Sequence, residues 1–330
     1  MTAAVAPFAV SLFAAVAFGR PILRWLQASG VRQTISSDAP ERHAAKQGTP
    51  TMGGLILLAG TVCGTAVGWA AWGVSSGGAL AACAIGLSAA IGALDDRLSL
   101  RRGTNLGLKA REKFALQVVV ALAFVAGVAL IGARRDQTIV AGLDLGSAYW
   151  PLAVVLIVGL SNATNLADGL DGLTAGSAAI ASAGLAVMLS SGSGKDVTVL
   201  AAALAGGCAG LLWYGAYPAL VFMGDTGSLA VGAGLACIGL VGKLELPLIV
   251  ATLPFWAETL SVMIQVTVFK WRKRRHGIEF ARAHRVFRRA PLHHHLEECG
   301  VPETRIVARF WLCAAACTAL GLAWHLGLAR

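Results

Sequence analysis

The sequence has few charged residues. Only 13% of its 330 residues are Asp, Glu, Lys or Arg, whereas 56% are hydrophobic and the mean hydropathy is +0.69. Soluble globular domains typically carry about 25% charged residues. The composition therefore excludes a soluble globular chain and predicts an all-α polytopic integral membrane protein.

Two further absences narrow the class of protein. The seven cysteines show no CxxC or Cys/His spacing, so we expect neither a zinc site nor a disulfide framework. Six of them lie within apolar runs and are interpreted as small core residues. No basic segment precedes the first apolar run, which favours a retained membrane span over a signal peptide.

Ten uncharged runs are long enough to cross about 30 Å of hydrocarbon at 1.5 Å per residue. They lie at roughly 3–19, 53–73, 79–94, 114–132, 147–166, 173–191, 197–217, 226–242, 246–269 and 306–325. We expect one transmembrane catalytic domain that covers residues 1–330.

The net charge of +10 is unevenly distributed. Ten spans place alternate loops on opposite sides, and the loops of one side hold 22 of the 27 Lys and Arg residues. By the positive-inside rule that side is cytoplasmic and both termini lie outside. The charge therefore indicates topology rather than nucleic-acid binding, with attraction of anionic lipid or phosphate to the inner face as a secondary interpretation.

A polar stretch, NATNLADGLDG at Asn162–Gly172, follows the fifth run on the cytoplasmic side. Carboxylates at the edge of the hydrocarbon are expensive and usually functional. The spacing of Asp168 and Asp171 predicts one face of a helical turn, beside Asn165, while glycines allow a ligand close to the backbone. The alternative is a solvated turn between helices.

Asp95 and Asp96 end the third run on the same side. Adjacent carboxylates repel, so one tends to have a raised pKa, which suits a general base or a cation ligand. The alternative is a charge cluster at a helix end that its own arginines neutralise.

Asp225 stands in VFMGDTGS at the entry to the eighth run. One carboxylate between glycines is enough for Mg²⁺, which usually takes substrate phosphates and water as its other ligands. Phe222, three residues earlier, is interpreted as a stacking partner for a base or as an interfacial anchor.

Other polar residues accompany these acids. Lys46, in the loop before the second run, is interpreted either as a positive-inside anchor or as a phosphate ligand. Glu258 and Gln265 lie in a run interrupted by prolines, where an intramembrane acid suggests function. The run His293–His295 favours hydrogen bonds to an anion, because neighbours in sequence seldom chelate one metal.

Four stretches on the cytoplasmic side together resemble a known family. They are Pro40–Gly54, Gly92–Gln117, Asn162–Gly172 with Val221–Ser228, and Ala290–Trp311. The motifs NLADGLDGL, FMGDTGS and APLHHHLE in one chain resemble the bacterial phospho-N-acetylmuramoyl-pentapeptide transferases, within the polyprenyl-phosphate N-acetylhexosamine-1-phosphate transferase superfamily. The resemblance covers nearly the whole chain in order.

The resemblance implies transfer of phospho-MurNAc-pentapeptide from UDP-MurNAc-pentapeptide to undecaprenyl phosphate, with Mg²⁺, at the inner leaflet of the bacterial plasma membrane. The products would be lipid I and UMP. On this basis Asp225 holds Mg²⁺, and Asp95 and Asp96 flank the lipid phosphate. The substrate-binding residues that it implies are Lys46, Thr51, Asn165, Asp168, Asp171, Phe222, His293, His294 and His295.

The chain departs from the family pattern at three positions. Ser99 stands where the family usually has a lysine, Ala93 replaces a phenylalanine, and Ala167 replaces a threonine. Without that lysine, the cation that meets the lipid phosphate is Arg97, Arg101 or Lys113.

Two rival functions are weighed against this one. A relative that uses another UDP-sugar would keep the aspartates but is expected to lack the three histidines. A proton-coupled transporter would bury its acids at mid-membrane within internal repeats, whereas here most acids lie on one rim and no repeat is visible. A homodimer is compatible with either transferase, since the sequence does not set the oligomeric state.

Overall fold

The computed structural model describes residues 2–29, 48–103, 107–131, 138–190, 192 and 194–327. The chain is mostly helical within these ranges. In order, the elements are α1 (Thr2–Ala28), α2 (Gly54–Trp72), α3 (Ser76–Arg102), α4 (Ala110–Ile131), β1 (Ile139–Val140), β2 (Leu143–Asp144), η2 (Gly146–Ala148), α5 (Tyr149–Ala167), α6 (Leu173–Ser190), α7 (Lys195–Gly215), α8 (Gly224–Val241), α9 (Glu245–Ala251), α10 (Leu253–His276), α11 (Ile278–Ala283), α12 (Leu292–Glu298) and α13 (Glu303–His325).

Nine helices in the described ranges are long and apolar enough to cross a membrane. The ninth predicted span, at 246–269, is a broken one, because α9 and α10 meet at an angle of 71°. Pro247 lies in α9 and Pro254 in the first turn of α10, where proline removes a backbone donor and crowds the preceding turn. The structure thus confirms an all-α polytopic membrane protein with nine or ten spans.

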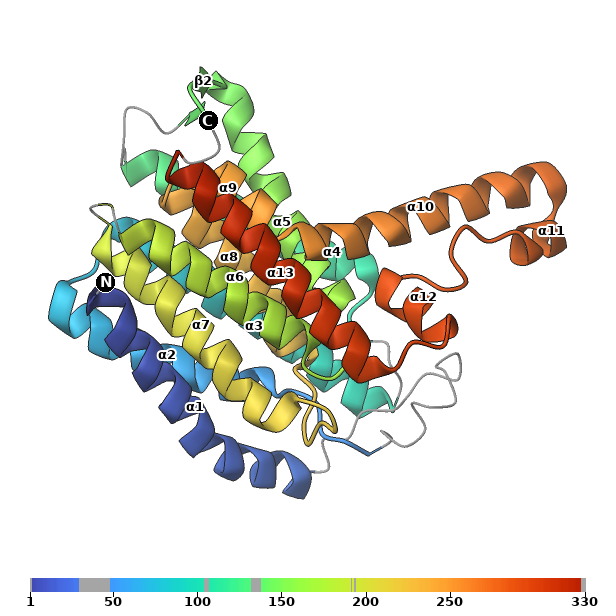
Figure 1. The fold of residues 1–330 in the computed structure, drawn as a ribbon, viewed down its shortest axis with the longest axis horizontal. Coiled ribbons are helices and arrows are strands. Elements are labelled where there is room, and N and C mark those ends of the chain that lie inside the picture. The colour runs from blue at the N-terminus through green and yellow to red at the C-terminus, as the bar shows by residue number, and fades with distance from the viewer. Residues whose placement is uncertain are drawn as a thin grey trace.

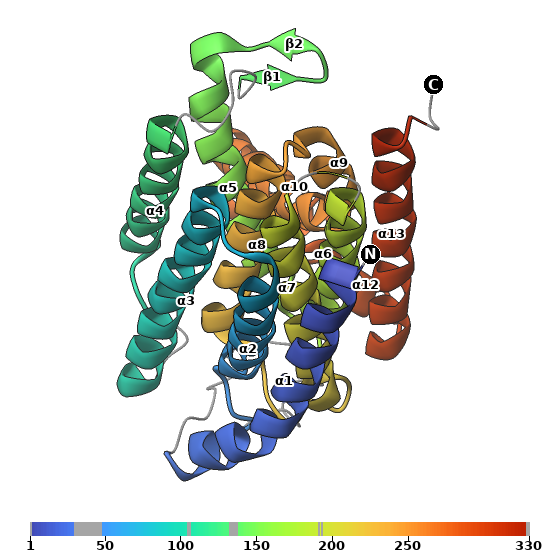
Figure 2. The same ribbon diagram turned by 90° about the vertical axis from the view of Figure 1, so that its left-hand side faces the viewer.

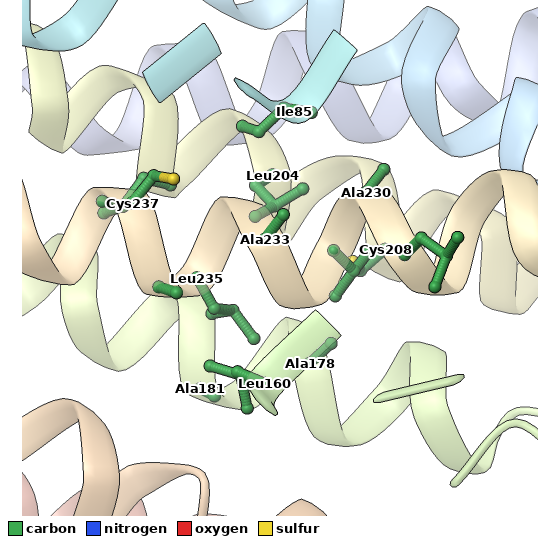
Figure 3. Close-up of a cluster of buried hydrophobic side chains, with 14 of the residues drawn as sticks. Ile85, Leu160, Ala178, Ala181, Leu204, Cys208, Ala230, Ala233, Leu235 and Cys237 are labelled. Carbon is green, nitrogen blue, oxygen red and sulfur yellow. The ribbon is translucent and has the colours of Figure 1, made fainter. Parts of the chain in front are cut away.

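The helices α7 and α8 form the centre of the bundle. α7 packs on α1, α2 and α6, and α8 packs on α3 and α5. Figure 3 shows small side chains of α8, such as Ala230 and Ala233, beside Leu204 of α7 and Ile85 of α3. Small residues let neighbouring helix backbones approach closely, so the ends of α3, α5 and α8 are held near one another.

The predicted core role of the cysteines is wrong for most of them. Only Cys208 and Cys237 are buried; Cys63 and Cys317 are partly exposed, and Cys83, Cys299 and Cys313 are exposed. The outer faces of membrane helices are also apolar, so a small apolar residue is compatible with either face. All seven cysteines are free, as expected.

The alternating apolar pattern TIVAGLDL at 138–145, broken at Gly142, predicts a short hairpin after the fourth span, and the structure has it as β1 and β2. Ile139 pairs with Asp144 and Val140 with Leu143. Ala141 and Gly142, at the turn, have φ of 49° and 82°, the left-handed pair that suits a two-residue hairpin loop. Figure 2 shows this hairpin at the end of the bundle opposite the C-terminal end of α3.

The helix α10 leaves the bundle. Figure 1 shows its C-terminal half extending away from the other helices, with α11 at its far end. The chain then returns to the bundle through α12, which contacts both α10 and α13. This excursion brings the three-histidine run back to the end of the bundle where the acidic residues lie.

Candidate functional site

Four carboxylates from separate parts of the sequence meet at one end of the bundle. Asp95 and Asp96 lie near the C-terminal end of α3, Asp168 directly follows α5, and Asp225 lies in the first turn of α8. A Cβ at Gly92 would overlap the backbone of Asp225, so only glycine allows α3 this close to α8. The tight packing of these helices therefore assembles the site.

Lys113 of α4 is the cation that meets this cluster. Its Nζ contacts Oδ2 of Asp225 and lies 3.4 Å from Oδ1 of Asp95. The Lys113 side chain is 20% exposed, whereas Arg97 and Arg101 are exposed on α3. Of the three cations considered in place of the missing family lysine, the structure thus brings Lys113 to the aspartates.

Asn165 holds the other oxygen of Asp225. Its Nδ2 donates to Oδ1 of Asp225 at 2.7 Å and to Oγ of Ser228 at 3.0 Å. Asn162, one turn earlier, donates to Oε1 of Gln117 at 2.9 Å, and Gln117 is buried. Sequence reasoning missed Gln117, although a buried polar residue within an apolar run is a signal of function in membrane helices.

Asp96 caps the N-terminus of α8. Its Oδ1 accepts from Asp225 N–H at 3.2 Å, and its Oδ2 accepts from Thr226 N–H at 3.0 Å and from Thr226 Oγ1 at 2.6 Å. Helix N-termini leave backbone donors without helical partners and attract negative charge. Asp96 therefore fixes where Asp225 lies, and its contact with the lipid phosphate stays a prediction.

Asp168 also binds the start of α8, by accepting a hydrogen bond from Gly224 N–H. Burial raises the pKa of Asp168 well above its ordinary value, and the carboxylates of Asp225 and Asp96 raise it further, while the Gly224 bond lowers it. Burial is the main cause of the raised pKa, and the crowding of negative charge at the end of the bundle adds to it; an added cation would relieve the crowding.

The expected pairing of Asp168 with Asp171 on one helical face is wrong. α5 ends at Ala167, and the chain turns before α6 begins. The Asp171 carboxylate accepts from Ala219 N–H at 3.0 Å, and Asp171 N–H donates to Oε1 of Glu303 at 2.8 Å. Asp171 is buried and ties the turn to neighbouring segments, while Asp168 alone faces α8.

Backbone hydrogen bonds join Phe222 to the residues on either side of Thr51. Phe222 N–H donates to Pro50 O at 2.9 Å, and Gly53 N–H donates to Phe222 O at 2.7 Å. This pairing places buried Thr51 close to Gly224 at the start of α8, and Phe222 stays partly exposed. Both predicted residues therefore border the cluster, while Lys46 lies outside the described residues.

The structure places His293 against the Asp168–Gly172 turn. His293 is 1% exposed, and a Cβ at Gly169 would overlap its Nε2. Gly169 thus makes room for a histidine of the chain itself, whereas the glycine was expected to make room for a ligand. The Nδ1 of His293 lies 3.2 Å from Oε2 of Glu258.

The other two histidines have different surroundings. Nδ1 of His294 lies 2.7 Å from Oε2 of Glu297, and burial lowers the pKa of His294 despite this contact. His295 accepts from Arg288 N–H at 3.2 Å and packs on the Phe287 ring with centroids 5.6 Å apart. His295 is thus engaged within its own loop, and its predicted substrate contact stays untested.

The donor chemistry of the cluster fits Mg²⁺. Among the residues that the structure describes, no three His, Cys, Asp or Glu side chains are placed to hold a metal by themselves. Mg²⁺ is usually held by one or two carboxylates together with phosphate oxygens and water. The contact of Lys113 with Asp95 and Asp225 shows that these carboxylates already attract a cation.

Comparisons with known proteins show the family of the chain. Residues 79–243 match the family model for glycosyl transferase family 4, and residues 46–58 match signature 1 of the phospho-N-acetylmuramoyl-pentapeptide-transferases. Relatives with that name include those of Gemmatimonas aurantiaca (41% identical, covering 97% of this chain and 92% of the relative), Heliobacterium modesticaldum (39%, 96% and 95%) and Prochlorococcus marinus (43%, 92% and 82%). The chain therefore belongs to the phospho-N-acetylmuramoyl-pentapeptide-transferase family.

Proposed function

We propose that the protein transfers phospho-MurNAc-pentapeptide from UDP-MurNAc-pentapeptide to undecaprenyl phosphate and forms lipid I and UMP. The observation that carries the proposal is the cluster of Asp95, Asp225 and Lys113, which α3, α8 and α4 bring together. Family membership and the name of the relatives support the same reaction.

The reaction brings two anionic phosphates together. An oxygen of the lipid phosphate forms a bond to the sugar-bearing phosphorus of the donor, the bond from that phosphorus to UMP breaks, and UMP leaves with the electron pair. Phosphoryl transfer of this kind depends mainly on positioning and on positive charge near the developing negative charge. Lys113 supplies such a charge beside Asp95, where the lipid phosphate is expected.

Asp225 would hold Mg²⁺ together with phosphate oxygens of the donor. When bound, the ion offsets the negative charge of the diphosphate. Asn165 and Lys113 hold the two oxygens of Asp225 in place, so this carboxylate is oriented before substrate arrives.

The donor would lie across the surrounding segments. Asn165, Asp168 and Phe222, with Thr51 and Lys46, would line the uridine pocket, and Asp171 supports the turn that carries Asp168. His293 and His294 would face the diphosphate or the sugar, with His295 beside them. Phe222 remains partly exposed next to the cluster, which suits stacking on a base.

We place the site on the cytoplasmic side of the bacterial plasma membrane, with both termini outside. The support is the concentration of 22 of 27 basic residues on the loops of that side. Single cysteines introduced at Arg97, Asp168 or Ala290 should react with an impermeant thiol reagent only after cells are opened. Labelling in intact cells would contradict this topology.

The function is tested with purified protein, undecaprenyl phosphate, Mg²⁺ and two donors in parallel. We expect turnover of UDP-MurNAc-pentapeptide and rejection of UDP-GlcNAc. Better use of UDP-GlcNAc would show that the protein serves another sugar donor, the nearest rival function.

A further inference from the structure

Glu258 is a buried acid that the reaction above does not use. It lies on α10 with 0% exposure, and its oxygens accept from His293 N–H at 3.2 and 3.4 Å. The same carboxylate lies 3.2 Å from Nδ1 of His293. A buried carboxylate without partners is strongly unfavourable, so Glu258 and His293 are held together as a pair.

Contacts from α10 also hold the histidine loop, the segment 287–295 that carries His293. Pro291 precedes α12 and supplies no side-chain cap, so the carboxylate of Glu258 takes the role of accepting the His293 N–H. About two turns further along α10, Gln265 exchanges two hydrogen bonds with the backbone of Phe287, at 3.0 and 3.3 Å. Two polar residues of α10 therefore hold the histidine loop in position.

The opposite edge of the His293 ring faces the site. Nε2 abuts Gly169, next to Asp168. Neither ring nitrogen makes a hydrogen bond within the described residues, although Nδ1 lies at ion-pair distance from Glu258. When one ring nitrogen of a histidine is engaged by a carboxylate, the other is the atom left for a ligand. With Nδ1 directed at Glu258, the ring presents Nε2 to the turn that carries Asp168.

We propose that Glu258 is a positioning residue, which keeps the proton on Nδ1 of His293 and leaves the lone pair of Nε2 to accept a hydrogen bond from a hydroxyl group of the bound UDP-sugar. The inference rests on the proposed function, because it assigns His293 to the donor substrate. Glu258 itself does not touch the substrate; it acts through the orientation of the ring.

The first experiment compares two isosteric changes of buried glutamates. Glu258→Gln keeps an acceptor for the His293 N–H but weakens the hold on Nδ1, and it should lower kcat/KM for the sugar donor about tenfold, with the KM for undecaprenyl phosphate unchanged. Glu245→Gln is the matched control, because Glu245 is also buried but bonds Tyr149 and Lys243 instead. Rates are expressed per folded protein, as measured by size-exclusion chromatography and thermal unfolding.

The second experiment separates positioning from a structural role. In His293→Gln the amide oxygen can occupy roughly the place of Nε2 and accepts a hydrogen bond without help from a carboxylate. In that background Glu258→Gln should change kcat/KM by less than about twofold, whereas it acts about tenfold on the parent. Equal effects in both backgrounds, or equal losses in the two glutamate variants, would overturn the proposal.

Gly169→Ala supplies a variant that leaves Glu258 intact. The added methyl group would push on Nε2, so turnover per folded protein should fall about as far as in Glu258→Gln, and parental turnover would overturn the proposal. The ratios are measured with whichever UDP-sugar the parent uses. The donor preference of the parent alone therefore tests the proposed function. The rate ratios of the variants test the pairing of Glu258 with His293.

Discussion

Lys113→Met would remove the ammonium from the acidic cluster and keep most of the apolar stem. In the parent, Nζ contacts Asp225 and lies 3.4 Å from Oδ1 of Asp95, and the side chain is 20% exposed. Breaking a fully buried ion pair by removing one partner costs about 3–5 kcal/mol, and an exposed pair contributes about 0–1 kcal/mol. For this mostly buried position we expect about 2–3 kcal/mol.

If that energy stabilises the transition state, turnover falls by roughly 30- to 150-fold, since each 1.4 kcal/mol is a factor of about ten. Initial rates are measured against undecaprenyl phosphate at saturating donor. We expect the larger part of the loss in the KM for the lipid, because the ammonium lies beside Asp95, where the lipid phosphate is expected.

Arg97→Met and Arg101→Met are the matched controls, because both side chains are exposed on α3. Each should change the rate by less than about threefold, as exposed charges contribute little. Turnover of Lys113→Met within about threefold of the parent, or a larger loss in either arginine variant, would refute this account of the cluster.

Three further changes test other parts of the site. Thr226→Val removes the hydroxyl hydrogen bond to Asp96, the carboxylate that caps α8, and should lower the free energy of unfolding by about 1.5–3 kcal/mol. Thr198→Val is the near-neutral control in the same thermal unfolding series, because the Thr198 hydroxyl bonds the carbonyl at the start of its own helix. Asp225→Asn should remove most Mg²⁺-dependent turnover, and activity within about tenfold of the parent would argue against its role as the metal ligand. Burial lowers the pKa of His294 below its ordinary 6.5, so the unfolded state takes up this proton first as pH falls below about 6.5. The parent should therefore lose stability below that pH, and His294→Gln should lose less. Parallel curves of unfolding free energy against pH for the two proteins would contradict this.

Local sequence patterns were sufficient for much of the architecture. Uncharged runs predicted the spans because each must be apolar along its own length to lie in lipid. The hairpin after the fourth span followed from alternation interrupted at Gly142, and the structure has it there. The break within the ninth span coincides with Pro247 and Pro254, since the effect of proline on a helix is local.

The roles of the polar residues depended on the direction in which each side chain points. Arg97 is closer to Asp95 in sequence than Lys113 is, but two residues correspond to about 200° around a helix, so Arg97 lies on the exposed side of α3. Lys113 reaches Asp95 because α4 runs back along α3.

The direction of the side chains also separates the two aspartates of each acidic pair. Asp95 and Asp96 are about 100° apart on α3, so one meets Lys113 while the other caps α8. Asp168 and Asp171 separate because α5 ends before them.

The sequence by itself determined that the chain spans a membrane, roughly where, and which residues were chemically unusual there. Only the tertiary structure decided which of these residues meet. The contacts of Lys113 with Asp225 and of Glu258 with His293 join segments far apart in the chain. Such contacts depend on how closely helix backbones pack and on which face each helix turns inward, and neither quantity is contained in any one local stretch of sequence.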